Sequence, residues 1–88
     1  SNDALLNPLR EAARANEWDR LKTQSVDLQA LVGHEAKVEA TLLLLEARCR
    51  THDVSTYRRY FDEAHRLHAG PRARALCKKY LTGQDCEP

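Results

Sequence analysis

Four consecutive leucines, Leu42–Leu45, constrain the fold of this chain more than any other feature. An α-helix has 3.6 residues per turn, so four successive side chains point most of the way around it. The apolar residues of the helix predicted over 35–50 form two stripes. One stripe is Val38, Leu42, Leu45 and Cys49, and the other is Ala40, Leu43, Leu44 and Ala47. A helix that is apolar on two sides either lies in the middle of a bundle or keeps one side for a partner.

The rest of the chain also has helical periodicity, and no segment alternates as a strand would. The predicted helices cover residues 4–15, 17–32, 35–50, 54–69 and 71–82. Gly33, Gly70 and Gly83 each follow one of these segments, where a left-handed residue commonly ends a helix. The fold class is therefore all-α. We expect a small antiparallel bundle of four to five helices, formed by two helical hairpins and a C-terminal helix.

Within the helix predicted over 17–32, one seam has the three- and four-residue spacing of a packed helix. It consists of Trp18, Leu21, Ser25, Leu28 and Val32. This seam predicts antiparallel packing of 17–32 on 4–15. Residues 1–83 are expected to form one helical domain, and residues 84–88 a flexible polar tail.

Length and composition limit the functions open to the chain. It has 88 residues, of which 31% are charged and 42% hydrophobic, as in folded globular domains. No apolar run approaches the roughly 20 residues of a membrane span, so no membrane contact is expected. A deep-pocketed enzyme is not expected from a chain of this size.

The three cysteines are not arranged as a metal or redox motif. Cys49 lies on an apolar stripe and is expected to act as a small hydrophobe. Cys77 and Cys86 can meet if the tail folds back, although nothing in the sequence requires it. These features predict a reduced protein located in the cytoplasm.

Catalytic and metal-binding arrangements are weak. His65 and His68 have a spacing that can ligate a metal, as do Cys49 and His52, but no further ligands converge in the sequence. We therefore expect no catalytic residue, no metal and no cofactor.

Basic residues gather in the C-terminal third. Residues 58–88 carry seven basic side chains against four acidic ones. Two pairs spaced by seven residues give a basic face, namely Arg59, Arg66, Arg72 and Lys79. Such a face could neutralise phosphates, which makes a small regulatory protein that binds nucleic acid the alternative function. The near-neutral chain charge and the acidic residues within the patch favour an ordinary solvated face instead.

Surplus apolar surface on the helix over 35–50 favours a protein-binding function. The predicted partner-binding residues are Leu43, Leu44, Ala47, Tyr60, Tyr80 and Leu81. The expected partner is a protein client with an amphipathic helix, and a homodimer seam is the other use of such a face. If the bundle itself covers the leucines, neither applies.

The segment Ala4-Leu5-Leu6 through Glu17-Trp18-Asp19-Arg20-Leu21 to Leu28-Gln29 resembles the opening hairpin of FliT-type flagellar export chaperones. The Gly-Pro-Arg-x-Arg-Ala stretch at 70–75 and Tyr80 are similar to that family's basic tail. The resemblance is mainly over residues 4–32.

The resemblance implies a small helical chaperone of the cytoplasm, linked to type III secretion. Such a chaperone shields the hydrophobic end of a filament-cap subunit, and some members bind a transcriptional regulator. It also implies that Trp18, Leu21 and Leu28 are scaffold residues. The aromatic residues at 57–61 and the leucine run depart from the family pattern, which leaves the client open. A helical-repeat adaptor, like the chaperones of secretion needle subunits, is a neighbouring alternative.

Overall fold

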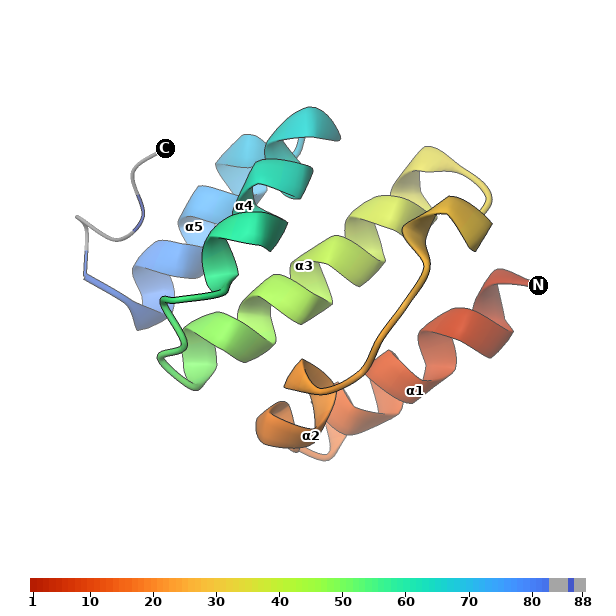
Figure 1. Cartoon of the computed structure of the whole chain (residues 1–88), viewed down its shortest axis with the longest axis horizontal. Coiled ribbons are helices and arrows are strands. Elements are labelled where there is room, and N and C mark those ends of the chain that lie inside the picture. Colours follow the sequence, from red (N-terminus) through yellow and green to blue (C-terminus); the bar gives the residue numbers. More distant parts are fainter. Residues whose placement is uncertain (83–85, 87–88) are drawn as a thin grey trace.

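The computed structural model describes residues 1–82 and 86, and it contains no strand in this part of the chain (Figure 1). The helices are α1 (Asn2–Arg14), α2 (Trp18–Lys22), the 3₁₀ turn η1 (Leu28–Ala30), α3 (His34–Arg50), α4 (Tyr57–Arg66) and α5 (Gly70–Tyr80). The predicted all-α class is confirmed, and the chain forms a small helical bundle.

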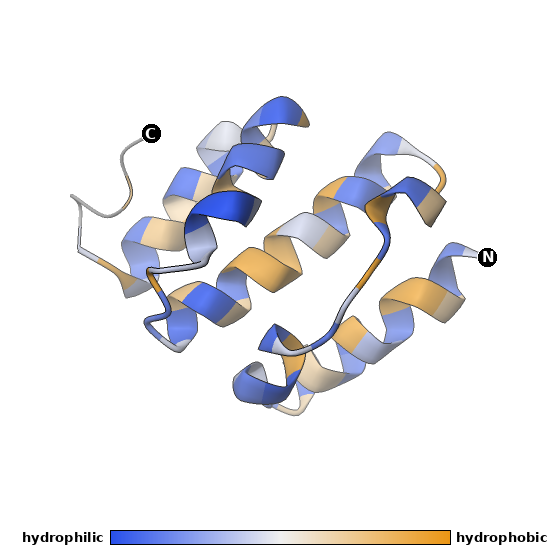
Figure 2. Ribbon diagram, viewed as in Figure 1, coloured by the Kyte–Doolittle hydropathy of each residue, from blue (hydrophilic) through white to orange (hydrophobic). Residues whose placement is uncertain are grey.

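Helix α3 lies in the middle of the bundle, with α1 and α2 on one side and α4 and α5 on the other (Figure 1). Figure 2 shows hydrophobic residues along the middle of α3 and hydrophilic residues concentrated toward its two ends. Each side of α3 contributes to a separate hydrophobic cluster. The N-terminal cluster consists of Leu6, Leu9, Ala12, Leu21, Leu31, Ala40, Leu44 and Ala47. The C-terminal cluster consists of Val38, Leu45, Cys49, Tyr57, Phe61, Ala64, Ala69, Ala73, Cys77 and Cys86.

The two stripes predicted for this helix match the two clusters. Leu44 and Leu45 are sealed in opposite clusters, while Leu42 and Leu43 are half-buried against the C-terminal and N-terminal cluster, respectively. The bundle thus covers most of the apolar circumference of α3 by itself. Full burial of one leucine stabilises a fold by roughly 1.5–3 kcal/mol, so both sides of α3 contribute substantially.

The helix predicted over 17–32 is wrong beyond Lys22. Helix α2 ends there, residues 24–27 are irregular, and only the short η1 follows. The side chain of Asp27 accepts a hydrogen bond from the backbone N–H of Gln29 at 3.0 Å, which starts η1 instead of continuing α2. Val32, expected on the packed seam, is 78% exposed.

Side chains of α1 and α3 bind backbone groups of η1 and of the two residues that follow it. The Lys37 ammonium donates to the carbonyl oxygens of Leu28 and Leu31 at 2.8 and 2.7 Å. The Asn2 carboxamide donates to the carbonyl of Val32 and accepts from its N–H, at 2.7 and 2.8 Å. These tertiary bonds replace the helical ones, which is how the segment can leave the helical conformation.

Three helices end on a non-glycine residue in the left-handed region. These residues are Asn16 after α1, His52 after α3 and His68 after α4, with φ of 56°, 55° and 61°. Each is followed by the long bond of a Schellman motif. The donor and acceptor pairs are Glu17 to Ala12, Asp53 to Arg48 and Ala69 to Ala64, all at 2.8 Å.

The glycines do not have the predicted role. Gly33, with φ of 96°, precedes the first residue of α3, and Gly70 is the first residue of α5. A Cβ on Gly70 would collide with the imidazole of His65, so this glycine permits close packing of α4 on α5. Gly83, predicted to end the last helix, lies outside the described residues.

Cys77 and Cys86 form a disulfide, and both are buried in the C-terminal cluster. This corrects the prediction of a fully reduced protein. Cys86 also departs from the predicted flexible tail of 84–88, whose other residues lie outside the described part. Cys49 is free and buried in the same cluster, where burial, with a smaller contribution from Glu46, raises the pKa of its thiol to about 11. A thiol that stays protonated is a poor nucleophile toward the disulfide.

We expect His52→Gly and His68→Gly each to raise the free energy of unfolding by about 0.5–1 kcal/mol, measured by urea denaturation. Glycine removes the steric cost of the left-handed conformation, and this gain exceeds the added entropy of the unfolded chain. The control is Ala75→Gly at an exposed position in the interior of α5, which should destabilise by about 1 kcal/mol. Destabilisation by both histidine variants would contradict this account of the helix ends.

Reduction of the Cys77–Cys86 disulfide should lower the free energy of unfolding by about 2–3 kcal/mol, because the bond closes a loop of nine residues. The measurement is urea denaturation with and without dithiothreitol. Cys86→Ser should show the lower stability in both conditions, and Cys49→Ser should keep the full response to the reductant. An unchanged midpoint of the wild type on reduction would rule out a stabilising bond.

Candidate partner-binding groove

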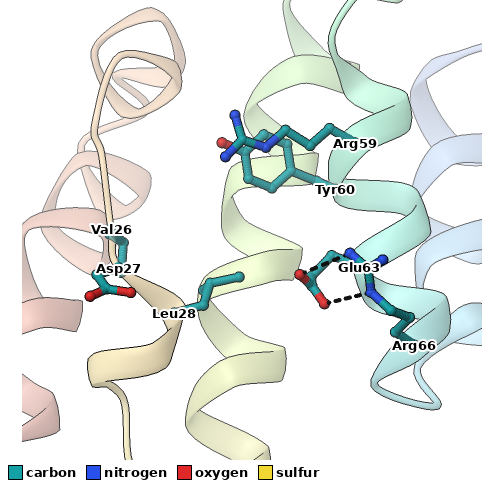
Figure 3. A pocket seen from close by; sticks show the side chains of 7 residues that line it. All are labelled: Val26, Asp27, Leu28, Arg59, Tyr60, Glu63 and Arg66. Carbon is teal, nitrogen blue, oxygen red and sulfur yellow. Dashed lines mark hydrogen bonds and ion pairs between the residues drawn. The ribbon is translucent and has the colours of Figure 1, made fainter.

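A groove opens between the irregular segment before η1 and helix α4 (Figure 3). Its volume is about 430 Å³. The lining residues are Val26, Asp27, Leu28, Arg59, Tyr60, Glu63 and Arg66. The four from α4 are spaced so that they share one side of that helix. Opposite them, Val26 and Asp27 come from the irregular segment and Leu28 from the start of η1. We call this cavity the 26–66 groove.

Tyr60 is the fixed part of the α4 wall. Its half-buried ring packs against both hydrophobic clusters. The guanidinium of Arg48 lies 4.3 Å from the ring centroid, and that of Arg59 lies 5.5 Å from it. Cations over an aromatic face are held by the ring quadrupole. The tyrosine therefore has little freedom to move out of the wall.

Arg48 connects this wall to the rest of the bundle. Its guanidinium donates to the hydroxyl of Thr56 at 3.1 Å and to the carbonyl of Lys22 at 3.3 Å. It also donates to the carbonyl of Leu44 in its own helix at 3.2 Å. The end of α2, the end of α3 and the start of α4 are thus joined through one side chain beneath Tyr60.

The charges of the groove are mostly compensated within it. Arg66 and Glu63 form a two-pronged ion pair with distances of 3.2 and 3.3 Å, and this pairing raises the pKa of Arg66. The carboxylate of Asp27 accepts the N–H that caps η1. Arg59 is exposed and forms no ion pair with a carboxylate of residues 1–82. It is the one lining cation without such a partner there.

Two of the predicted partner-binding residues are not accessible. Leu44 is 2% exposed and Ala47 0%, because α1 and α2 cover that stripe of α3. This corrects their assignment as contact residues. Leu43 is half-buried against the same cluster, so little of the predicted apolar face on α3 is open.

The other three predicted contact residues lie in two places. Tyr60 lines the 26–66 groove. Tyr80 and Leu81 are half-buried against the C-terminal cluster and do not line this groove. The guanidinium carbon of Arg50 lies 4.4 Å from the ring centroid of Tyr80. The same carbon lies 4.3 Å from the ring centroid of Trp18. Tyr80 therefore serves a contact between α3 and α5.

The predicted basic face is also divided. Arg59 and Arg66 line the groove together. Arg72, on α5, pairs with Glu35 at 3.6 Å, and the ammonium of Lys79 lies 5.6 Å from the Tyr80 centroid. The structure thus combines one residue of the predicted client site with two of the predicted basic patch.

Sequence reasoning missed the opposite wall of the groove, Val26 to Leu28, because a continuous helix over 17–32 leaves no such segment. The available signal was Ser25-Val26-Asp27, in which a β-branched residue stands between two residues that favour helix caps. Glu63 is one of the acidic residues within the predicted basic patch, and the sequence did not indicate a role for it in a binding site.

In residues 1–82 and 86, no group of three or more histidine, cysteine or acidic side chains is close enough to hold a metal ion. No helix of this part is long and apolar enough to cross a membrane.

A second, more open cavity of about 470 Å³ lies at the N-terminus between α1 and the end of η1. It is lined by Ser1, Asn2, Ala4, Leu5, Ala30 and Val32. These residues carry no ionisable side chain, so this cavity offers a ligand less varied chemistry than the 26–66 groove.

Comparison with known proteins gives no relative. No family model, no curated protein and no solved structure matches the chain.

We expect Arg48→Ala to lower the free energy of unfolding by about 1–2 kcal/mol, because it removes three hydrogen bonds and the contact with Tyr60. The measurement is urea denaturation. The matched control is Arg14→Ala at an exposed position in the last turn of α1, which should change stability by less than about 0.5 kcal/mol. Equal effects of the two substitutions would contradict the bracing role of Arg48.

Proposed function

We propose that this chain is a non-enzymatic module that binds a segment of another protein in the 26–66 groove. The observation that supports the proposal is the pairing of an immobilised aromatic wall with a facing apolar segment. In the α4 wall, the ring of Tyr60 packs against the guanidinium of Arg48 from α3. In the facing wall, the side chains of Val26 and Leu28 are half-buried. Rigid aromatic residues beside apolar side chains are typical of binding sites for proteins.

The size of the groove limits what can enter. A volume of about 430 Å³ accommodates a few large side chains but not a whole helix. The partner therefore inserts side chains from one face of an amphipathic segment, with its polar face in solvent. This keeps the predicted type of client and moves its site from Leu44 and Ala47 to the groove.

An export chaperone is the more specific form of this proposal, supported by the resemblance of residues 4–32 to the FliT-type family. The groove would shield an apolar part of a secreted or flagellar client. The Cys77–Cys86 disulfide counts against a cytoplasmic location, because cytosolic thiols are normally kept reduced. A helical-repeat adaptor would use the same groove.

Nucleic acid is the second candidate, because Arg59 and Arg66 flank Tyr60, and an aromatic ring between cations can stack on a base. Two carboxylates, those of Asp27 and Glu63, line the same groove and would repel a phosphate backbone. Protein is therefore the preferred partner.

The test compares two identical substitutions in the affinity capture of proteins from extracts of the source cells. Val26→Arg puts a bulky charged side chain into the groove, whereas Val54→Arg changes a valine that is 45% exposed and lies outside it. We expect wild type and Val54→Arg to retain the same protein, and Val26→Arg to lose it while its circular dichroism spectrum stays unchanged. Equal capture by both variants would exclude the groove as the binding site.

A gel-shift titration with single-stranded and duplex DNA and RNA examines the second candidate. A shift that weakens with salt and is lost in Arg59→Gln, which removes a lining cation, would favour nucleic acid over protein. No shift at low salt would remove that candidate.

A further inference from the structure

We infer that the segment bound in the 26–66 groove presents a carboxylate side chain to Arg59 and an apolar side chain to Val26 and Tyr60. This inference rests on the proposed function and specifies the chemistry of the partner. It is argued from the ion pairs and hydrogen bonds that the charged groups of the groove already form, and from the lack of such a bond at Arg59 within residues 1–82.

Each ionised group of the groove except Arg59 has a partner from the chain itself. Glu63 and Arg66 bind each other through two contacts, and Asp27 caps η1. Arg59 has only the ring of Tyr60 beside it among the contacts of the described residues. An incoming anion at Arg59 breaks no existing ion pair. An incoming cation at Glu63 would have to compete with Arg66, and at Asp27 it would share a carboxylate that already accepts the N–H of Gln29.

The position of Arg59 suits this contact. Figure 3 shows its side chain extending over Tyr60 toward the wall that carries Val26. The planar guanidinium can therefore face a ligand while the ring supports it from behind. A carboxylate that reaches it lies close to the apolar part of the groove.

A single carboxylate fits better than a chain of phosphates. The carboxylate of Asp27 stands on the wall opposite α4 and has no ion pair within residues 1–82, so a ligand with several negative charges meets repulsion there. One acidic residue three or four positions from an apolar residue on a helical peptide reaches Arg59 and the apolar wall together. The occupant is thus an amphipathic segment with an acidic residue beside its apolar stripe.

The test is a display selection from a random library of 16-residue peptides, with the whole protein as target. Parallel selections use wild type, Val26→Arg, Arg59→Gln and Arg72→Gln. Arg72 is an exposed arginine on α5 outside the groove and serves as the matched control.

We expect peptides enriched on wild type to carry an aspartate or glutamate next to an apolar stripe. Arg59→Gln should weaken the best of these peptides about tenfold, as expected for loss of one charged hydrogen-bonded contact, and Arg72→Gln should leave their affinity unchanged. The affinity for wild type should also fall with added salt, and less so for Arg59→Gln.

The other outcomes separate the two proposals. Peptides that bind wild type but not Val26→Arg, without an acidic preference or with one that Arg59→Gln retains, would overturn the carboxylate inference and leave the groove as a binding site. No enrichment on wild type relative to Val26→Arg would overturn both.

Discussion

The structure depends on the burial of two opposite faces of α3. Leu44 packs with α1 and α2, and Leu45, the next residue, packs with α4 and α5. Helices α1 and α2 contact each other and α3, and helices α4 and α5 contact each other and α3. The two halves of the bundle are therefore joined chiefly through α3. Neither cluster is complete without the residues that α3 supplies. The two halves should therefore unfold together, as expected of a small domain.

The groove is a result of the same arrangement. Because α3 separates the two halves, the irregular segment after α2 and the helix α4 approach each other only at the surface. Tyr60 forms part of the α4 wall and packs on both clusters, and the guanidinium of Arg48 lies against its ring. The shape of the groove is therefore set by the packing of the bundle itself.

The sequence predicted the features that depend on burial. The all-α class and the two stripes of α3 follow from periodicity alone, whereas the position of α3 in the middle of the bundle was one of two alternatives left open. Periodicity could not show which face the bundle itself would cover, and so Leu44 and Ala47 were assigned to a partner although α1 and α2 bury them.

Features that depend on single polar contacts could not be predicted in this way. The seam over 17–32 has helical spacing, yet bonds from Lys37, Asn2 and Asp27 hold its second half in another conformation. These partners are distant in sequence or compete locally with the helix. One wall of the groove is formed by that segment, so the location of the groove could not be predicted from the sequence. Three residues of the other wall were predicted individually, Tyr60 as a partner contact and Arg59 and Arg66 as part of the basic face.

Arg48 and Arg50 are two residues apart on α3, so their side chains leave the last turn on nearly opposite sides. One guanidinium reaches Tyr60 of α4, and the other stacks between Trp18 of α2 and Tyr80 of α5. A lysine at either place would keep the positive charge and its favourable position at the helix C-terminus, but a compact ammonium cannot lie flat between two rings. These two positions therefore demand a particular shape of cation, and exchange of one basic residue for the other is not conservative here.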